Sequence, residues 1–401
     1  MKKLLVFAMC IVMLIGCKKE YHTPSAVNST PEKTFQSAPK CGIDLNVEFT
    51  AKMMKASKQR DEQEKISARK PKDDPNPIQT QTVIYLDANG HTVENTRWNW
   101  SGTFHCPAPG LTDHQMAAII KSVKEDFSTF QITVTSDVNL YNRTSKANRI
   151  HVVITNFRGL EHIFPYFGGI AYIGSLGWQD DTPCFVFADV AYGYTPYIAE
   201  IVSHEAGHTI GLIHQSEYYT NGTLKYEYHS GFYSLPWNLT WRAIMGTGYN
   251  GDIAGWMWGR TLQGFQNDTD ILSALGVYAD NTSNSFSLAK QIKLKGATKR
   301  VLFEELINKR QDQDVYMVNS GDIKFSIIAG GNCDIQVFVY TPEEKLIAQF
   351  NDQNSLGISE KTIKTKGNKI YLKVVANDLM IGDIQSEIQY AGQYTLVAQK
   401  I

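Results

Sequence analysis

The residues His204-Glu205-Ala206-Gly207-His208-Thr209-Ile210-Gly211-Leu212-Ile213-His214 form the most informative segment of this 401-residue chain. Residues four apart on a helix lie one turn apart on one face, so His204 and His208 can bind one metal ion together. Glu205 stands beside them, close enough to act on a water that the metal activates. Gly211 can end the helix in a left-handed conformation, and the turn brings His214 round as a third nitrogen ligand. Three neutral imidazoles leave a tetrahedral Zn²⁺ one open position, which is the pattern of a catalytic site.

The spacing of this segment is specific. The shorter motif of His204, Glu205 and His208 alone arises by accident now and then in long chains. Requiring Gly211 and His214 in addition cuts accidental matches roughly five-hundred-fold in a chain with 10 His and 30 Gly. A helix also begins where the motif needs it, because Thr195 precedes Pro196 and proline is tolerated in the first turn. A buried histidine cluster without a metal is the alternative interpretation. The retained Glu205 favours an active site over one that has lost activity.

The flanking sequence predicts an α+β unit over residues 79–282. Thr112 and Gln115 have the spacing of a capping box, and apolar residues recur at helical spacing after them, which predicts a helix behind a sheet. A last helix is expected near residues 268–278. Apolar β-type runs predict a sheet of about five strands at residues 82–86, 130–135, 149–155, 169–175 and 184–188.

After about residue 283 the pattern changes to short β-type runs separated by Gly, Asn, Asp and Pro. Strand-like patterns with such turn signals favour an all-β domain, and most of all a sandwich. We therefore expect a β-sandwich domain over residues 283–401. Examples of these β-type runs are residues 315–318, 323–328, 335–340, 370–375 and 394–398.

The N-terminus has the features of an export signal. Two lysines precede a short apolar run that ends in Leu14-Ile15-Gly16-Cys17, which resembles the lipobox of bacterial lipoproteins. Residues 1–17 are therefore expected to be a lipoprotein signal peptide, with Cys17 as the lipidated residue that anchors the chain at the outer membrane or cell surface. A plain signal peptide with a stray cysteine is the alternative. The polar residues 18–78 are expected to be a tether or a pro-segment.

Composition and charge exclude several classes of protein. The 39 Lys and Arg balance 40 Asp and Glu, and a formal net charge of −1 argues against a nucleic-acid-binding protein. A hydrophobic fraction of 43% excludes a wholly disordered chain, and the single prominent apolar run excludes a polytopic membrane protein. The cysteines beyond the signal permit disulfides in an exported protein, but their pairing does not follow from the sequence. They are Cys41, Cys106, Cys184 and Cys333.

The motif H-E-x-x-H-x-x-G-x-x-H resembles that of the metzincin zinc endopeptidases, which also have a methionine turn beneath the metal. The segment Ala243-Ile244-Met245-Gly246-Thr247-Gly248-Tyr249 is similar to that turn, and Met245 follows His214 by 31 residues. The resemblance covers about residues 80–280, looks closest to exported bacterial members, and implies a sheet-and-helix upper half above a short irregular lower half. The later region, ending in Tyr390-Ala391-Gly392-Gln393-Tyr394-Thr395-Leu396, is similar to bacterial pre-peptidase C-terminal domains.

The resemblance implies a zinc-dependent endopeptidase that hydrolyses peptide bonds of extracellular or periplasmic proteins. His204, His208 and His214 are the implied zinc ligands. Glu205 is the implied general base, which takes a proton from the attacking water and passes it to the leaving amine. Met245 would support the metal site from below without ligating the ion.

Two further features are expected at such a site. Tyr249, four residues after Met245, is a candidate contact to the metal or the oxyanion, and a packed aromatic is the alternative. The substrate is expected to lie extended along an edge strand, pairing main chain to main chain. The expected strand includes Gly169, Ile170, Ala171 and Tyr172.

The expected pro-segment contains a candidate latency switch. Pro39-Lys40-Cys41-Gly42-Ile43-Asp44 resembles the cysteine-switch segment of matrix metalloprotease pro-peptides. In those proteins a thiolate fills the open zinc position, and a thiolate is a good zinc ligand. A disulfide between Cys41 and Cys106, or an idle thiol, is the alternative.

Calcium is a second candidate cofactor, at Asp180-Asp181 or at Asp312 and Asp314. Neither set has the spacing of an EF-hand loop, and solvated loop acids are the alternative. The oligomeric state does not follow from the sequence.

Two other functions stay open at this stage. One is a surface lipoprotein that binds a protein or glycan through its β-domain, with a latent or non-proteolytic metal unit. The other is a zinc hydrolase that acts on something other than a peptide. The physiological substrate, the cleavage specificity and the role of the C-terminal domain are not defined by these patterns.

Overall fold

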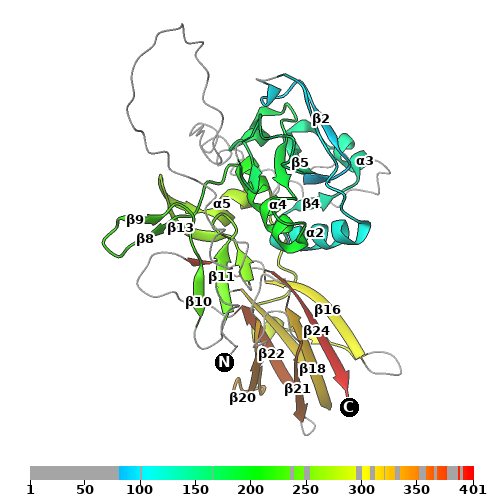
Figure 1. The fold of residues 1–401 in the computed structure, drawn as a ribbon. Coiled ribbons are helices and arrows are strands. Elements are labelled where there is room, and N and C mark those ends of the chain that lie inside the picture. Colours follow the sequence, from blue (N-terminus) through cyan, green and yellow to red (C-terminus); the bar gives the residue numbers. More distant parts are fainter. Residues whose placement is uncertain are drawn as a thin grey trace, which may run out of the picture.

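The computed structural model describes residues 81–99, 102–164, 166–234, 239–247, 253–294, 300–307, 312–319, 321–329, 335–351, 358–364, 368–376, 387–388 and 392–401. The predictions for residues 1–17 and 18–78, which include Cys17 and Cys41, lie outside this part of the chain, and so does Tyr249. The described chain is a mixed α+β structure with many strands and few helices (Figure 1). None of its helices is long and apolar enough to cross a membrane.

A five-stranded sheet organises the first unit, as the sequence predicts. Its order is β4 (Ile132–Thr135), β1 (Thr82–Asp87), β5 (Arg149–Thr155), β7 (Cys184–Phe187) and β6 (Gly169–Ile170). The first four strands are parallel, and β6 pairs antiparallel with β7 at one edge. Because successive side chains along a strand point to opposite faces, every second residue of these strands faces one side of the sheet and the remaining residues face the other side.

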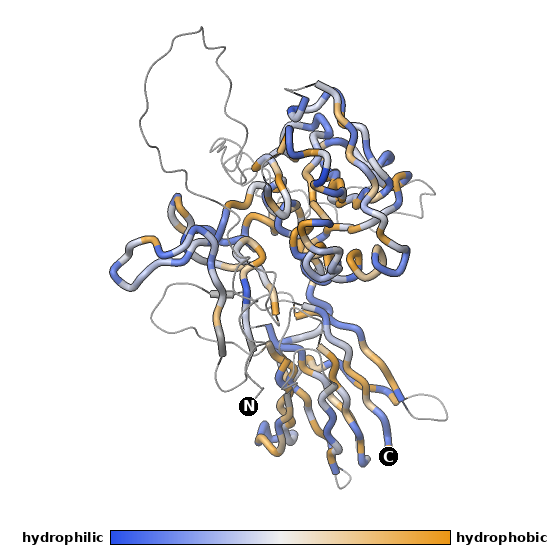
Figure 2. The backbone as a smooth tube through the Cα atoms, viewed as in Figure 1, coloured by the Kyte–Doolittle hydropathy of each residue, from blue (hydrophilic) through white to orange (hydrophobic). Residues whose placement is uncertain are grey.

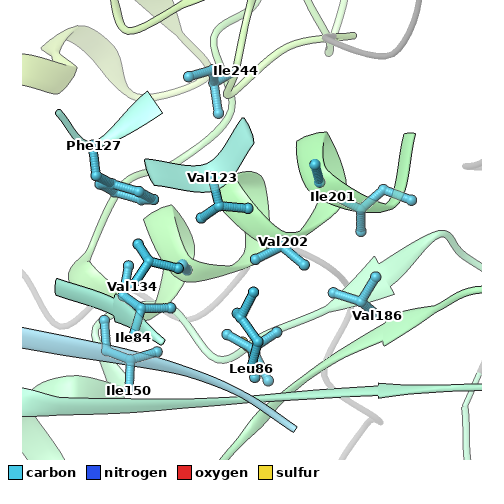
Figure 3. Packing of buried hydrophobic residues seen from close by; sticks show 14 of the residues in the cluster. Ile84, Leu86, Val123, Phe127, Val134, Ile150, Val186, Ile201, Val202 and Ile244 are labelled. Carbon is cyan, nitrogen blue, oxygen red and sulfur yellow. The ribbon is translucent and has the colours of Figure 1, made fainter. Parts of the chain in front are cut away.

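Two helices cover one face of this sheet. The predicted capping box at the start of α2 (Asp113–Asp126) is confirmed, since the Thr112 hydroxyl accepts from the Gln115 backbone and the Gln115 side chain accepts from the Thr112 backbone. The second helix, α4 (Thr195–Ile210), packs against α2 and the sheet in one buried apolar cluster (Figure 3). The residues labelled there are Ile84, Leu86, Val123, Phe127, Val134, Ile150, Val186, Ile201, Val202 and Ile244. Each such side chain contributes about 1.5–3 kcal/mol when fully buried, so this cluster fixes α4 on the sheet.

The opposite face of the sheet is covered by a hairpin and short helical segments. The hairpin is formed by β2 (His91–Val93) and β3 (Phe104–Cys106), and α3 (Val138–Arg143) packs near β1. Two single 3-10 turns, η2 (Lys146–Asn148) and η3 (Ser175–Trp178), connect neighbouring elements. A second, mainly aromatic cluster fills this side and includes Trp98, Phe104, Phe157, Phe164, Phe185 and Phe187.

Two predicted elements are each five residues longer than those observed. The strand predicted over residues 169–175 ends at Ile170, because the backbone N–H of Gly174 bonds to the carbonyl of His208 at 2.8 Å instead of continuing a ladder. The helix predicted over residues 268–278 is α5 (Asp268–Ser273). It ends early because Gly276 adopts φ +103°, after which Val277 forms an isolated bridge with Phe130, just before β4.

The chain between α4 and α5 forms small sheets. These contain β8 (Glu217–Tyr218), β9 (Leu224–Tyr226), β10 (Phe232–Ser234), β11 (Leu239–Ala243), β12 (Ile253–Gly255), β13 (Met257–Thr261) and β14 (Gly264–Asn267). The order β10-β11-β12 forms one sheet, and β14-β13-β23 (Glu387–Ile388) forms another. The strand β23, from the later part of the chain, therefore pairs with β13 in the same small sheet.

The C-terminal region consists of two β-sheets around one apolar cluster. One sheet has the order β15 (Lys290–Ile292), β17 (Gln313–Val318), β22 (Ile370–Ala376), β19 (Ile335–Tyr340) and β20 (Leu346–Asn351). The other has the order β16 (Arg300–Ile307), β24 (Gly392–Lys400), β18 (Asp322–Ala329) and β21 (Ile358–Lys364). A short turn, η5 (Phe286–Leu288), precedes them. Hydrophobic and hydrophilic residues are interspersed along these strands (Figure 2), which allows one face of each sheet to be buried.

The apolar clusters divide in agreement with this arrangement. Residues between Ile84 and Leu275 form the cluster under α4, whereas residues between Ile292 and Ala398 form the cluster between the two C-terminal sheets. The domain limits at residues 79, 282 and 283 stay predictions.

Candidate metal centre

Three buried histidines converge at the C-terminal end of α4. His204 and His208 lie one turn apart, and Gly211 ends the helix with φ +126° while its N–H bonds back to the carbonyls of Gly207 and His208. The turn brings His214 back toward them, as the spacing predicts. The ring centroids are 4.6 Å apart between His204 and His208, 4.8 Å between His208 and His214, and 5.3 Å between His204 and His214. One nitrogen from each ring lies within 4.8 Å of the others.

Each imidazole is held in position through its Nδ1 atom. The Nδ1 of His204 donates to the carbonyl of Ile244 at 2.7 Å, and the Nδ1 of His208 donates to the carbonyl of Leu212 at 2.7 Å. The Nδ1 of His214 donates to Oε1 of Glu227 at 3.2 Å. These acceptors place the ring proton on Nδ1, so the Nε2 lone pairs are available to face a common centre.

The electrostatics of the site favour neutral histidines. Burial lowers the pKa of His204 to about 4, and burial together with the neighbouring rings lowers the pKa of His208 and His214 well below the ordinary value. The Nε2 atoms of His208 and His214 are 3.1 Å apart. Two unprotonated nitrogens at that distance repel each other unless a cation lies between them. Zinc–nitrogen bonds of about 2.0–2.1 Å give a tetrahedral edge of roughly 3.3 Å, so the donor set fits Zn²⁺.

Glu205 lies beside the histidines without a complete set of partners. Its side chain is buried, and its Oε2 atom has no hydrogen-bond partner among the described residues. Burial raises the pKa of this carboxyl well above its ordinary value. A nearby divalent cation would offset that shift by favouring the carboxylate. A carboxyl kept in this environment is suited to exchange a proton with a small molecule beside it.

The edge strand β6 packs directly on Glu205. A Cβ atom at Gly169 would lie 2.7 Å from both Cγ and Oε1 of Glu205, a distance that real Cβ contacts essentially never show. Gly169 is therefore required for the close approach of the strand to the helix. Ile170 is buried and completes the short strand.

The remaining residues of the predicted edge strand lie elsewhere. Ala171 is buried in the main cluster, and Tyr172 lies beyond the end of β6. The Tyr172 ring is 4.2 Å from that of Trp98, and its hydroxyl donates to the carbonyl of Arg97 at 3.3 Å. The aromatic cluster on the far face of the sheet holds this side chain, so the predicted strand is correct only for Gly169 and Ile170.

The segment predicted to be a methionine turn lies against the C-terminal half of α4. Met245 is fully buried, and a Cβ atom at Gly207 would lie 2.7 Å from its Sδ atom. The preceding residue, Ile244, supplies the carbonyl that orients His204. The carbonyl of Met245 accepts from the N–H of Gln215 at 2.8 Å, next to His214 in the chain. The turn therefore ties two histidine-bearing segments together.

Two residues at the site were not singled out by the sequence patterns. Glu227 holds His214, and burial raises the pKa of this glutamate. The ring of Tyr228 lies 4.0 Å from that of His214 and 6.3 Å from that of His204, in nearly parallel planes for the second pair. Tyr228 is one of several aromatic residues between His214 and Met245, and no spacing rule distinguishes it from the others.

The candidate calcium residues have different environments. Asp180 pairs with Arg97 at 3.3 Å, and Asp181 pairs with Arg149 and Lys146, each at 2.7 Å. Cations of the protein therefore already neutralise this pair.

The second acidic set is enlarged by Asp280. Ligand atoms of Asp280, Asp312 and Asp314 lie within 4.8 Å of one another. The Oδ1 atom of Asp314 is buried without a partner among the described residues, while Tyr394 donates to its Oδ2 atom. Burial raises the pKa of Asp314 to about 8, and the neighbouring acids add to the shift.

Cys106 and Cys184 are free thiols buried in the protein. Burial raises the pKa of Cys106 to about 12, so its thiol is protonated at neutral pH.

Comparisons with known proteins identify the segment that carries the histidines. Residues 165–237 match the model described as metallo-peptidase family M12B, reprolysin-like. No curated protein matches the chain. Among solved structures, the pre-peptidase C-terminal domain of a collagenase from Bacillus anthracis is 18% identical, covers 29% of this chain and 99% of its own length, and has a TM-score of 0.22. A periplasmic inhibitor of g-type lysozyme, PliG from Aeromonas hydrophila, is 10% identical. The match covers 28% of this chain and 94% of that chain, with a TM-score of 0.20.

Myroilysin is 14% identical, with 35% of this chain and 45% of that chain covered and a TM-score of 0.20. The match to the family model is independent of these structures and includes α4 with all three histidines. The histidine-bearing segment is therefore similar to reprolysin-like metallopeptidases, which confirms the resemblance to zinc peptidases that its motif indicates.

Proposed function

We propose that this protein is a zinc-dependent endopeptidase that hydrolyses peptide bonds of extracellular or periplasmic proteins. The observation that carries the proposal is the convergence of three buried, neutral imidazoles next to a buried carboxyl with an oxygen that lacks a partner among the described residues. His204, His208 and His214 would hold the ion. Bound there, Zn²⁺ would supply Lewis acidity toward a carbonyl oxygen and would acidify water.

The protein's own groups account for the remaining steps. Glu205 accepts a proton from the attacking water and then delivers it to the nitrogen of the leaving amine, so that one carboxyl serves both halves of the reaction. Ile244, Leu212 and Glu227 keep the Nδ1–H bonds of the histidines in place, which fixes the direction of the Nε2 lone pairs. Burial excludes water from this network and strengthens its hydrogen bonds.

The substrate chain is proposed to pair with β6. This strand is at the edge of the described sheet, and Gly169 brings its backbone against Glu205. An extended peptide added at an edge presents one carbonyl at a fixed position, which suits attack at a single bond.

The assay is cleavage of denatured casein by the purified chain, with and without a zinc chelator, beside Glu205→Gln. General bases contribute about 10²–10⁴-fold, so Glu205→Gln should lose at least about 100-fold in rate while it retains zinc. Gln115→Ala is the control variant, because it changes only the N-terminal cap of α2 and should leave cleavage unchanged. Cleavage that survives both the chelator and Glu205→Gln would refute the proposal.

The N-terminal assignments are parts of the same proposal. Cys17 is proposed to carry lipid and to anchor the protein at the outer membrane or cell surface, and Cys41 is proposed as a thiolate ligand that keeps the zinc site latent. If zinc is bound but casein is not cut, Cys41→Ser should release activity. A silent Cys41→Ser variant that binds zinc would instead favour a surface lipoprotein that binds a protein or glycan.

Two further contacts complete the proposal. Tyr249 is proposed to contact the metal or the oxyanion. Calcium is proposed at Asp280, Asp312 and Asp314, because the buried Oδ1 of Asp314 lacks a partner among the described residues. Calcium titration monitored by thermal unfolding tests this site, and an unchanged Tm would contradict it.

A further inference from the structure

A second cluster of potential metal ligands lies on the other face of the central sheet from α4. Leu86 and Val152 face the helices, so the alternating residues Asp87 of β1 and His151 of β5 face away from them. His91, the first residue of β2, reaches the same point from the hairpin. One ligand atom from each of the three residues lies within 4.8 Å of the others.

The contacts of this cluster converge on a single oxygen. Oδ2 of Asp87 is 3.1 Å from Nε2 of His151 and 3.4 Å from Nδ1 of His91. The other oxygen, Oδ1, accepts from the backbone N–H of Asn89 at 3.1 Å. Asn89 therefore orients the carboxylate and leaves Oδ2 toward the two imidazoles, which is the arrangement of an oriented metal ligand.

The ring geometry repeats that of the candidate zinc centre. The rings of His91 and His151 have centroids 4.6 Å apart and planes at 82°, and those of His204 and His208 have centroids 4.6 Å apart and planes at 85°. A tetrahedral ion with bonds of about 2.0–2.2 Å separates its ligand atoms by roughly 3.3–3.5 Å. The distances from Oδ2 to the two nitrogens are close to that edge.

We propose that Asp87, His91 and His151 bind a second divalent transition-metal ion, with Zn²⁺ as the ion that this imidazole and carboxylate set suits best. Asp87 and His151 are buried, whereas the side chain of His91 is 29% exposed, so the ion enters from the side of the hairpin. A water on that side completes four ligands.

The position of the cluster would allow a bound ion to link the hairpin to the central sheet. Its ligands come from β1, β2 and β5, and β2 belongs to a two-stranded hairpin that is not part of the central sheet. An ion bound by all three residues would fasten the hairpin to the sheet. Binding to the folded chain alone would also raise the stability of the protein in proportion to the logarithm of zinc concentration.

The test is zinc counting on the full chain after stripping and reloading, by elemental mass spectrometry with competition from a chromophoric chelator. Wild type should bind two ions, and His204→Ala/His208→Ala should bind one. His91→Gln and Asp87→Asn should each remove one ion from wild type and the last ion from the double variant. His105→Gln is the matched control, because this exposed hairpin histidine contacts Thr92 outside the cluster.

Each outcome decides the proposal. His91→Gln is the mildest change, since the side chain is partly exposed, and a normal Tm in the stripped state shows that the variant is folded. One ion lost in His91→Gln but not in His105→Gln supports the site. A wild-type protein that binds a single ion at saturating zinc, lost in His204→Ala/His208→Ala and unaffected by His91→Gln, would overturn it.

Discussion

The contact between β6 and α4 makes Gly169→Ala the most informative substitution. The added methyl carbon would lie 2.7 Å from Cγ and Oε1 of Glu205 and from Cγ2 of Ile201. Ordinary van der Waals contact begins at 3.4 Å, so the strand or the glutamate must move by at least 0.7 Å. The crowding comes from a strand and a helix that are both fixed by the main cluster, which limits how the strain is relieved.

The size of the effect follows from this displacement. Moving a reacting group by about 1 Å costs about 10²-fold in rate, so we expect kcat/KM on casein to fall on the order of 100-fold. Overpacking a core costs about 1–3 kcal/mol, which lowers the Tm of a unit of this size by about 2–12 °C. The zinc content should stay at the wild-type level, because the three atoms nearest to the added methyl belong to Glu205 and Ile201 and not to a histidine.

The neighbouring glycine provides a matched control. A Cβ atom at Gly168 would lie 3.1 Å from Cδ1 of Ile201, the flexible end of that side chain, and would not approach Glu205. Gly168→Ala should therefore lose less than about tenfold in kcat/KM. Wild-type activity in Gly169→Ala, or equal losses in both variants, would refute the reasoning that Gly169 positions Glu205.

Other contacts make predictions of their own. Glu227→Gln removes the charge that holds Nδ1 of His214, so zinc affinity should fall about 10–100-fold in chelator competition, and an unchanged affinity would contradict this role. Met245→Ala should cost about 2–5 kcal/mol of unfolding free energy in urea because it opens a cavity beside α4, whereas Met245→Leu should cost less than about 1.5 kcal/mol. Burial opposes ionisation of Asp181, but hydrogen bonds from Arg149 and a lysine lower its pKa from 3.8 to about 2. The ionised Asp181 carboxylate therefore contributes to the free energy of unfolding above pH 3.8, and this contribution is lost as the pH falls through about 2. After solvent screening it is about 1 kcal/mol, and Asp181→Asn should remove that part of the acid dependence of unfolding.

The central part of the site could be predicted because its residues are close in the sequence. His204 and His208 share a helix, and Gly211 needs only local backbone freedom to turn the chain toward His214. The capping box at Thr112 is equally local. Such features depend on helical geometry and a single turn, which the sequence specifies without knowledge of the remaining fold.

Element ends were harder to predict because tertiary hydrogen bonds determine them. The β-type pattern continues past Ile170, yet the backbone at Gly174 bonds to the carbonyl of His208 and leaves the sheet. The strands β15, β16, β20 and β21 of the C-terminal region are not among the β-type runs named from the sequence. In β16, Glu304 and Glu305 separate a short apolar run from Leu306 and Ile307, and only Ile307 is fully buried, so no long apolar run marks the strand.

Contacts between distant segments do not follow from spacing at all. Asp87 and His151 are 64 residues apart, and their contact depends on the parallel register that pairs Tyr85 with His151. A shift of that register by one residue would turn His151 to the helix-covered face and separate the pair. Glu227 likewise reaches His214 only because the chain folds back at β8 and β9. Asp87, His151 and Glu227 are therefore brought to their partners by strand pairing. His204, His208 and His214 are instead brought together by a helix and its end.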